Sequence, residues 1–269
     1  MVDTVLNTYE IKIEQEDINK FVKYFDLIFL TKIETPRNAV RFINSISFSM
    51  PLLSGEVNMG ELMLVEGMKI FLPNQYKLIR DNSHIFSGIY ATKEVNAEKY
   101  KYLFDSIAKT STDLNEFERK NVEVLLKDLF PEYSKNFTKD KNWKLEAYFG
   151  DIATRITEDY AKWHKEKRIA VPTYFNRYFS YSVDCSQISD KEFNEFIQSI
   201  LTWNKEDIEV KLSIWIMCRM GVEFISKVRN SPGAIPWDTA LKLTQVLINF
   251  IGSEDFEDCL LYTSDAADE

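Results

Sequence analysis

Two arginines four residues apart, Arg37 and Arg41, are the side chains of this sequence best suited to bind an anion. They lie in the stretch IETPRNAVRFINS, directly after a Thr-Pro pair. On a helix this spacing places both guanidinium groups on one face, with their Cβ atoms about 6 Å apart. A guanidinium is permanently charged and matches the geometry of carboxylate and phosphate groups. The pair therefore predicts an anion site, with phosphate as the best ligand.

No motif for nucleotide or hydrolytic chemistry accompanies these arginines. None of the eight glycines is followed by lysine, so the sequence contains no P-loop to cradle phosphates with backbone amides. It also contains no Gly-x-Gly, Gly-x-Ser-x-Gly or His-Glu-x-x-His. The acidic pair Glu158-Asp159 fits a solvated helix face, and neither Cys185 nor Cys218 has a histidine close in the sequence. The residues predict no self-sufficient catalytic centre and no metal site.

A second cationic and aromatic cluster occupies Lys162–Ser182. Basic residues interleaved with Tyr and Phe can stack on nucleic-acid bases. The acidic composition of the chain and the even spacing of the aromatic residues instead favour packing in a core. Arg168 and Arg177 bracket the cluster, and each could bind an anion or pair with a nearby carboxylate. We favour the carboxylate for both.

The bulk composition excludes several classes of protein. The net charge of −9 and a pI of about 5.0 argue against a nucleic-acid binder or a protein of anionic membranes, both of which need a basic surface. No apolar run approaches the roughly 20 residues of a membrane-spanning helix. The three cysteines are too few and too dispersed for a disulfide framework, which fits a reducing compartment. We therefore predict a cytoplasmic protein.

Apolar residues recur with helical spacing along nearly the whole chain, so the predicted fold class is all-α. The best strand signal is a minor one, at Glu10–Ile13. Thr35 is predicted to cap a helix that has Pro36 at its first position, and Ser189 with Glu192 forms a predicted capping box. The predicted helices are Asp17–Lys32, Pro36–Ser49, Met59–Phe71, Pro73–Asn82, Ala97–Lys109, Asp113–Phe130, a short one at PTYFNRYF, Phe193–Leu201, Lys205–Arg229 and Pro236–Phe250. The stretch Trp143–Lys167 has an ambiguous pattern at its start and a clearly helical one from Asp151 onward.

The chain divides into three regions on these patterns. Residues 1–130 form a multi-helix region, and the polar stretch Pro131–Asn142 marks a boundary or hinge before a second helical region, 131–258. The last eleven residues, CLLYTSDAADE, can be back-translated to codons that resemble a transposase mosaic end followed by its sequencing adapter. We therefore expect 259–269 to be an unpacked adapter translation, and the coding sequence to have been cut at its 3′ end.

Three stretches together resemble the C-terminal portion of the KAP-family P-loop NTPases, which are AAA- and STAND-like proteins. The first runs from IETPRNAVRFINS to FLPNQYKLI and is similar to the family's Thr-Pro-Arg helix and the segment after it. The second is KRIAVPTYFNRYFSYSV, and the third is ISDKEFNEFI. The resemblance implies a helical lid that follows an AAA-like ATPase core, with relatives in phage exclusion and membrane-associated signalling. The family's P-loop and its magnesium-holding acidic strand are not in this sequence.

Two functions follow as hypotheses. In the first, residues 1–130 are the lid of an ATP-driven switch, and Arg37 and Arg41 reach the phosphate of ATP bound with Mg²⁺ to the chain's own NTPase core. The chain alone would then be inactive. In the second, the chain is a free-standing α-helical interaction module, with protein partners or self-association. A hydrolase or nuclease without a recognisable motif is a third, weaker class.

Overall fold

The structure is a computed structural model that describes residues 7–9, 11–87, 114–131, 160–218, 220–229, 231 and 235–251. These residues form helices and no strand, which confirms the all-α prediction; Ile11–Glu14 belongs to no regular element. The predicted helix Ala97–Lys109 and the segment Cys259–Glu269 lie outside the described residues. So do the predicted boundary Pro131–Asn142 after its first residue and the stretch Trp143–Lys167 before Tyr160. None of the described helices combines the length and apolarity needed to cross a bilayer.

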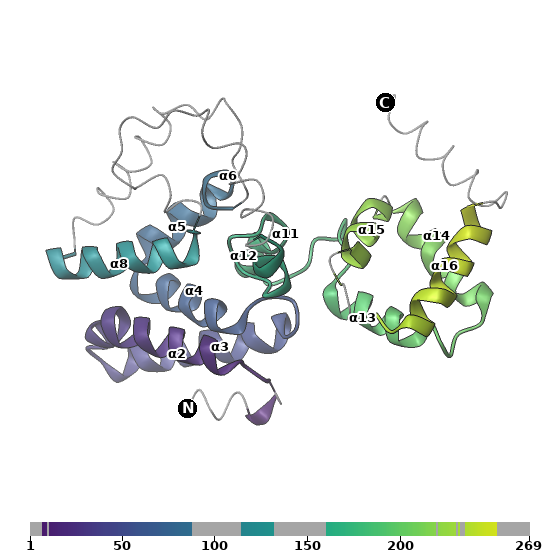
Figure 1. Cartoon of the computed structure of the whole chain (residues 1–269). Coiled ribbons are helices and arrows are strands. Elements are labelled where there is room, and N and C mark those ends of the chain that lie inside the picture. Colours follow the sequence, from purple (N-terminus) through teal and green to yellow (C-terminus); the bar gives the residue numbers. More distant parts are fainter. Residues whose placement is uncertain are drawn as a thin grey trace, which may run out of the picture. The chain divides into compact units, whose positions relative to one another are not determined.

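The first compact unit covers residues 1–182 and the second residues 183–269 (Figure 1). The first unit opens with one continuous helical run, in which a π-helical and a 3₁₀ segment extend α2 to Lys32 as the sequence predicts. The described elements of this unit are α2 Gln15–Tyr24, η1 Phe25–Phe29, η2 Leu30–Lys32, α3 Pro36–Leu53, α4 Met59–Phe71, α5 Pro73–Asp81, α6 Ser83–Phe86, α8 Glu116–Leu129, α11 Pro172–Phe175 and α12 Arg177–Ser180.

Helix α4 is the centre of the first unit. All ten residues from Met59 to Met68 are buried, because α2 and α3 pack on one side of the helix and α5 follows on the other (Figure 1). Helix α2 approaches closely at Gly60, where an added Cβ would lie 2.8 Å from the Cβ of Asp17. The core of the unit therefore forms around one apolar helix that is covered on every side.

The division between the units differs from the boundary expected at residue 131. Phe130 and Phe175 belong to the same buried core, with ring centroids 6.4 Å apart. The aromatic segment after Lys162 packs into this core through Trp163, Tyr174 and Tyr178, as the sequence predicts. Since aromatic burial holds this segment in the first unit, the structure divides the chain after Ser182.

The second unit is a smaller helical assembly with its own core. Its elements are α13 Asp190–Ser199, α14 Lys205–Met217, α15 Gly221–Arg229 and α16 Trp237–Ile251. Phe196, Trp215 and Phe224 form its aromatic centre, with ring centroids 4.9 to 6.0 Å apart. The single helix predicted over Lys205–Arg229 is wrong, because α14 ends at Met217 and α15 begins at Gly221. Glycine is a poor residue for a helix interior and a tolerated one at a terminus.

Candidate functional site

Helix α3 holds the two arginines and begins as the sequence predicts. Thr35 has extended backbone angles, and its side chain accepts a hydrogen bond from the Asn38 amide at 3.4 Å. Pro36 occupies the first helical position, where its lack of an N–H costs nothing. Further along, Phe42, Ile46 and three other residues of the helix are buried, chiefly against α4. The packing fixes the direction of α3, and the cap fixes where it starts.

Arg37 and Arg41 lie on the solvent side of α3. Both side chains are exposed, and neither makes an ion pair or a side-chain hydrogen bond with any residue that the structure describes. The obvious internal partner, Glu56, is buried and lies 2.7 Å from Arg177 through its Oε2. The two guanidinium groups are therefore available together for an anion from outside the described fold.

The other two candidate arginines are used inside the first unit. Arg168 Nε lies 2.7 Å from Glu61 Oε1, and Arg177 Nη1 lies 2.7 Å from Glu56 Oε2. Arg177 is almost completely buried, and its guanidinium also lies over the ring of Tyr174 at 4.9 Å. The prediction that both arginines pair with carboxylates is confirmed. They are structural ions and are not open to a ligand.

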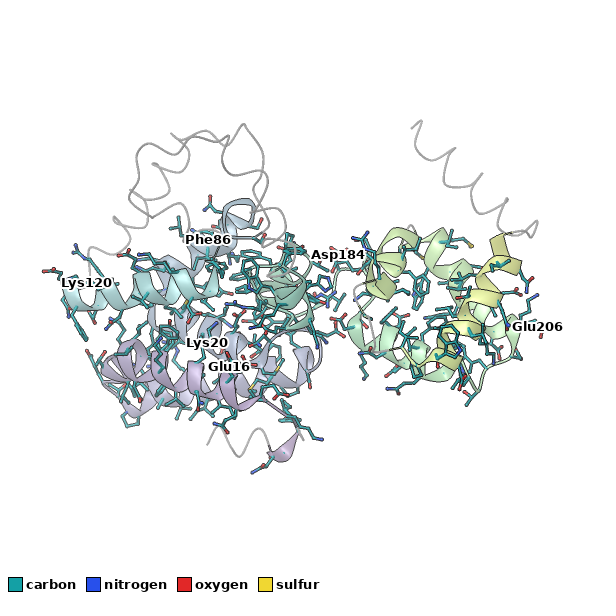
Figure 2. The ribbon with its side chains drawn as sticks, viewed as in Figure 1. Glu16, Lys20, Phe86, Lys120, Asp184 and Glu206 are labelled. Atoms are coloured by element: carbon teal, nitrogen blue, oxygen red, sulfur yellow. The ribbon has the colours of Figure 1, made fainter. Side chains whose placement is uncertain are left out.

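The buried Glu61 is the centre of a partly buried ionic cluster that was not predicted from the sequence. Its carboxylate receives Lys20 Nζ at 3.0 Å, Arg168 Nε at 2.7 Å and the Ile169 amide at 2.8 Å. Asp128 joins the same group through Lys20 at 3.3 Å. Figure 2 labels Lys20 inside the first unit, on α2. We call Lys20, Glu61, Asp128 and Arg168 the Glu61 cluster; it connects α2, α4, α8 and the turn before α11.

The electrostatics of the Glu61 cluster favour its ionised form. Burial alone would raise the pKa of Glu61, but the positive charges of Lys20 and Arg168 outweigh burial and hold the pKa below its ordinary value. Asp128 behaves in the same way, since Lys20 and the Tyr24 hydroxyl overcome its desolvation and lower its pKa. Neighbouring Asp17 has a raised pKa because burial dominates. A general acid or base needs a pKa near the working pH. The pKa of Glu61 is instead lowered, away from neutral pH.

A second polar group surrounds the buried Glu66. Ser45 Oγ donates to Glu66 Oε2, Lys69 Nζ lies 3.3 Å from the same oxygen, and the Tyr181 hydroxyl donates to Glu66 Oε1 at 2.7 Å. Serine beside lysine is the arrangement of a nucleophile and its base. Here the Ser45 hydroxyl donates to the Glu66 carboxylate and accepts from Lys69 at 3.4 Å, so it is held as a partner of the carboxylate. The group joins α3, α4 and the end of α12 and does not form a catalytic dyad.

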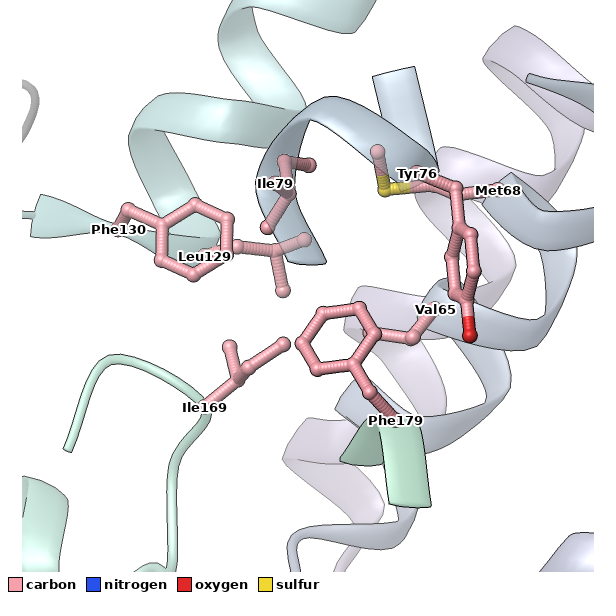
Figure 3. A pocket seen from close by; sticks show the side chains of 8 residues that line it. All are labelled: Val65, Met68, Tyr76, Ile79, Leu129, Phe130, Ile169 and Phe179. Atoms are coloured by element: carbon pink, nitrogen blue, oxygen red, sulfur yellow. The ribbon is translucent and has the colours of Figure 1, made fainter. Parts of the chain in front are cut away.

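An interior space enclosed by described residues of the first unit is lined by neither Glu61 nor Glu66. The interior space shown in Figure 3 is lined by apolar side chains and the ring of Tyr76, with Val65, Leu129 and Phe179 among them. These side chains leave no room for a water molecule. Among the described residues, no three His, Cys, Asp or Glu side chains gather in a way that could hold a metal ion.

One sequence signal could have revealed Glu61 and Glu66. The segment MGELMLVEGMKIF is apolar on all sides, which is typical of a fully buried helix. A carboxylate within such a helix is buried and must have a partner. The identity of the partners is not readable in the same way, because Glu61 and Arg168 are 107 positions apart.

Comparison with known proteins adds no relative. No protein-family model, no curated protein and no solved structure matches this chain.

Proposed function

We propose that α3 is a phosphate-sensing helix, with Arg37 and Arg41 as its ligands. Their target is the terminal phosphate of ATP that a separate nucleotide-binding core holds together with Mg²⁺. In this proposal the chain is the helical lid and downstream region of a P-loop ATPase switch. The observation that carries the proposal is the exposure of two arginines on one helix face without any partner among the described residues. An ion pair between exposed side chains usually contributes little free energy, whereas a bidentate contact of arginine with phosphate is strong.

The mechanism of such a switch follows from differential binding. A core with bound ATP presents a charged terminal phosphate to the arginines, and hydrolysis removes that group. The lid then has less affinity for the core, so the nucleotide state biases the relative position of the two. The packing of α3 on α4 transmits this bias to the rest of the first unit, since every residue from Met59 to Met68 is buried.

The resemblance of the Thr-Pro-Arg helix to KAP-family NTPases supports this proposal. It supports the chain's own NTPase core as the first partner and a role in phage defence or signalling. The scarcity of cysteine agrees with a cytoplasmic location. The chain itself supplies no P-loop and no described metal ligands, so ATP and Mg²⁺ belong to the core.

Arginine-detected NMR tests the phosphate contact on the chain alone. Titration with sodium tripolyphosphate is expected to shift the Nε–H signals of Arg37 and Arg41 and to leave those of the paired Arg168 and Arg177 unchanged. A contact made only through two exposed arginines is weak, with a Kd of roughly millimolar order. Arg80, exposed on α5 beside Asp81, is the internal control. If its signal moves as far as those of Arg37 and Arg41, the binding is non-specific and the proposal fails.

A free-standing interaction module is the second candidate function. The observation that favours it is the number of large apolar side chains exposed on helices of both units, such as Phe48 on α3 and Trp237 on α16. Single exposed apolar residues are normal on a folded protein. A continuous stripe of them is not, and helix α14 has one.

A further inference from the structure

Helix α14 is apolar on two opposite faces. Ile208, Leu212 and Trp215 are buried in the core of the second unit, at positions i, i+4 and i+7. Val210, Ile214 and Met217 repeat the same spacing on the other side, and they are 59%, 48% and 54% exposed. The two sets are offset by two residues, so at 100° per residue they lie about 160° apart on the helix. We call Val210, Ile214 and Met217 the outward stripe.

The outward stripe is not needed for the fold of the second unit. The inward residues Ile208, Leu212 and Trp215 already pack α14 into the core. A surface helix ordinarily has polar residues on the face opposite such a set. A helix that is apolar all round is normally covered on both sides. Two turns of apolar side chains, spaced as in a helix–helix seam, therefore indicate a helical partner.

Acidic side chains lie beside this stripe at its amino-terminal end. Glu206 and Asp207 stand in the first turn of α14, and Figure 2 labels Glu206 at the outer edge of its unit. Both are exposed, and neither forms an ion pair with a described residue. The two lysines of α14 are already engaged, Lys205 with Glu209 at 3.5 Å and Lys211 with Glu192. The charge that is left free beside the stripe is negative.

We propose that the outward stripe of α14 docks an amphipathic helix of a partner protein. This helix carries apolar residues at helical spacing, and lysine or arginine at the end that meets Glu206 and Asp207. The acidic end disfavours an anionic membrane surface as the occupant. It also disfavours a parallel second copy, since the four carboxylates would then face each other. The footprint is only about two turns long, so the complex is a transient one of micromolar strength.

Two synthetic peptides test the proposal on the full chain. One is an amphipathic helix with leucine at i, i+4 and i+7 and lysines at one end; its twin has glutamates in place of the lysines. Fluorescence anisotropy is expected to show that the lysine peptide binds about tenfold tighter than its twin. The substitution Ile214→Glu should weaken binding of the lysine peptide by at least about tenfold, because a charge then lies among the apolar side chains of the contact. The double change Glu206→Gln and Asp207→Asn should remove the preference for lysine.

The matched control is Ile248→Glu, which places the same charge at a 66% exposed isoleucine of α16. Its binding should stay within about twofold of the parent, and circular dichroism checks that every variant is folded. Equal binding of the two peptides, or binding that Ile214→Glu leaves unchanged, overturns the proposal.

Three further measurements identify other occupants of the stripe, and each positive result also overturns the proposal. A dimer in sedimentation velocity that Ile214→Glu dissociates would assign the stripe to a second copy. Binding to phosphatidylserine vesicles that Ile214→Glu abolishes would assign it to a membrane. Slow alkylation of Cys218 relative to the exposed Cys185 would show that another part of the same chain covers the stripe.

Discussion

Arg168 Nε lies 2.7 Å from Glu61 Oε1, although the two residues are 107 positions apart in the chain. This contact fastens the turn before α11 to the central helix α4. The neighbouring Ile169 amide donates to Glu61 Oε2, so one buried carboxylate holds both the side chain and the backbone of the turn. Lys20 brings α2 to the same carboxylate. The first unit therefore depends on Glu61 more than on any exposed ion pair.

The change Glu61→Gln should destabilise the first unit by about 3 to 5 kcal/mol, because it removes the buried carboxylate and leaves the partly buried Lys20 and Arg168 to share Asp128. The amide keeps the size of the side chain, so the loss reports charge and hydrogen bonding rather than a cavity. Urea unfolding followed by circular dichroism measures it. The control is Glu116→Gln on α8, whose partner Lys120 is exposed, and it should cause no measurable change. Equal effects of the two changes would contradict a special role for Glu61.

Stability should fall in acid through the same cluster. The pKa of Glu61 is held below its ordinary 4.5 and that of Asp128 below its ordinary 3.8, so both contribute stability above those values. The contribution is lost as the pH falls through the lower pKa values of the folded state. Asp17 acts with the opposite sign, because its raised pKa means that its ionised form costs stability at neutral pH.

Urea midpoints at about pH 6, 4.5 and 3 test this balance. The parent should lose stability over this range, and Glu61→Gln should lose less, since the variant has no charge to neutralise at that position. A variant with the same acid sensitivity as the parent would show that other carboxylates control the pH dependence.

Close packing of α2 on α4 gives the third prediction. The change Gly60→Ala should cost about 1 to 3 kcal/mol, because the new Cβ would lie 2.8 Å from the Cβ of Asp17 and 2.9 Å from its carbonyl oxygen. Backbone cannot move aside as a flexible side chain can, so α2 must shift. Thermal unfolding measures the effect.

Gly221→Ala is the matched control for this substitution. Its Cβ would meet nothing nearer than Ile216 Cγ1 at 3.5 Å, and alanine has the better helix propensity. This change should be neutral or stabilising. Destabilisation of similar size at both positions would mean that the close contact at Gly60 is not the cause.

Local features of the fold were predictable from the sequence, and partners distant in the chain were not. Thr35 caps α3 as predicted, since the cap needs only the Asn38 amide three residues on. Ser189 likewise accepts from the Glu192 amide at 2.9 Å. The Glu192 carboxylate, however, pairs with Lys211, nineteen positions away, rather than closing the predicted capping box. A contact within one turn depends on residue type alone, whereas a contact between helices depends on the packing of the whole unit.

The candidate site divides in the same way. The spacing of Arg37 and Arg41 on one helix face follows from the helical repeat, and both are exposed in the structure. The sequence also favoured pairing of Arg168 and Arg177 with carboxylates, because the aromatic residues around them indicate a core, and both arginines are paired in the structure. The sequence did not predict that α14 ends at Met217, because the pattern from Lys205 to Arg229 stays apolar through the break. Because α14 is apolar on two faces, the spacing of its apolar residues does not mark where the helix ends.

ATP turnover tests the two arginines when the chain is joined to the proposed nucleotide-binding core, or mixed with that core as a separate polypeptide. Replacing the arginine that reaches the terminal phosphate should lower the rate by about a thousandfold or more, as for other arginines supplied to a phosphoryl group. Arg37→Ala is expected to show the larger loss, since Arg37 lies nearer the start of α3, and Arg41→Ala the smaller. The chain without the core should not hydrolyse ATP, because it has no P-loop.

Folding stability distinguishes this role from a structural one. Arg37 and Arg41 are exposed and pair with no described residue, so neither replacement should change the melting temperature. Arg80→Ala removes an exposed arginine of the same unit and should retain the parental rate. If both Arg37→Ala and Arg41→Ala stay folded and turn over ATP like the parent, the phosphate-sensing role of α3 is wrong. That result would leave the proposal for the outward stripe of α14 unaffected, because the stripe lies in the other unit and involves neither arginine.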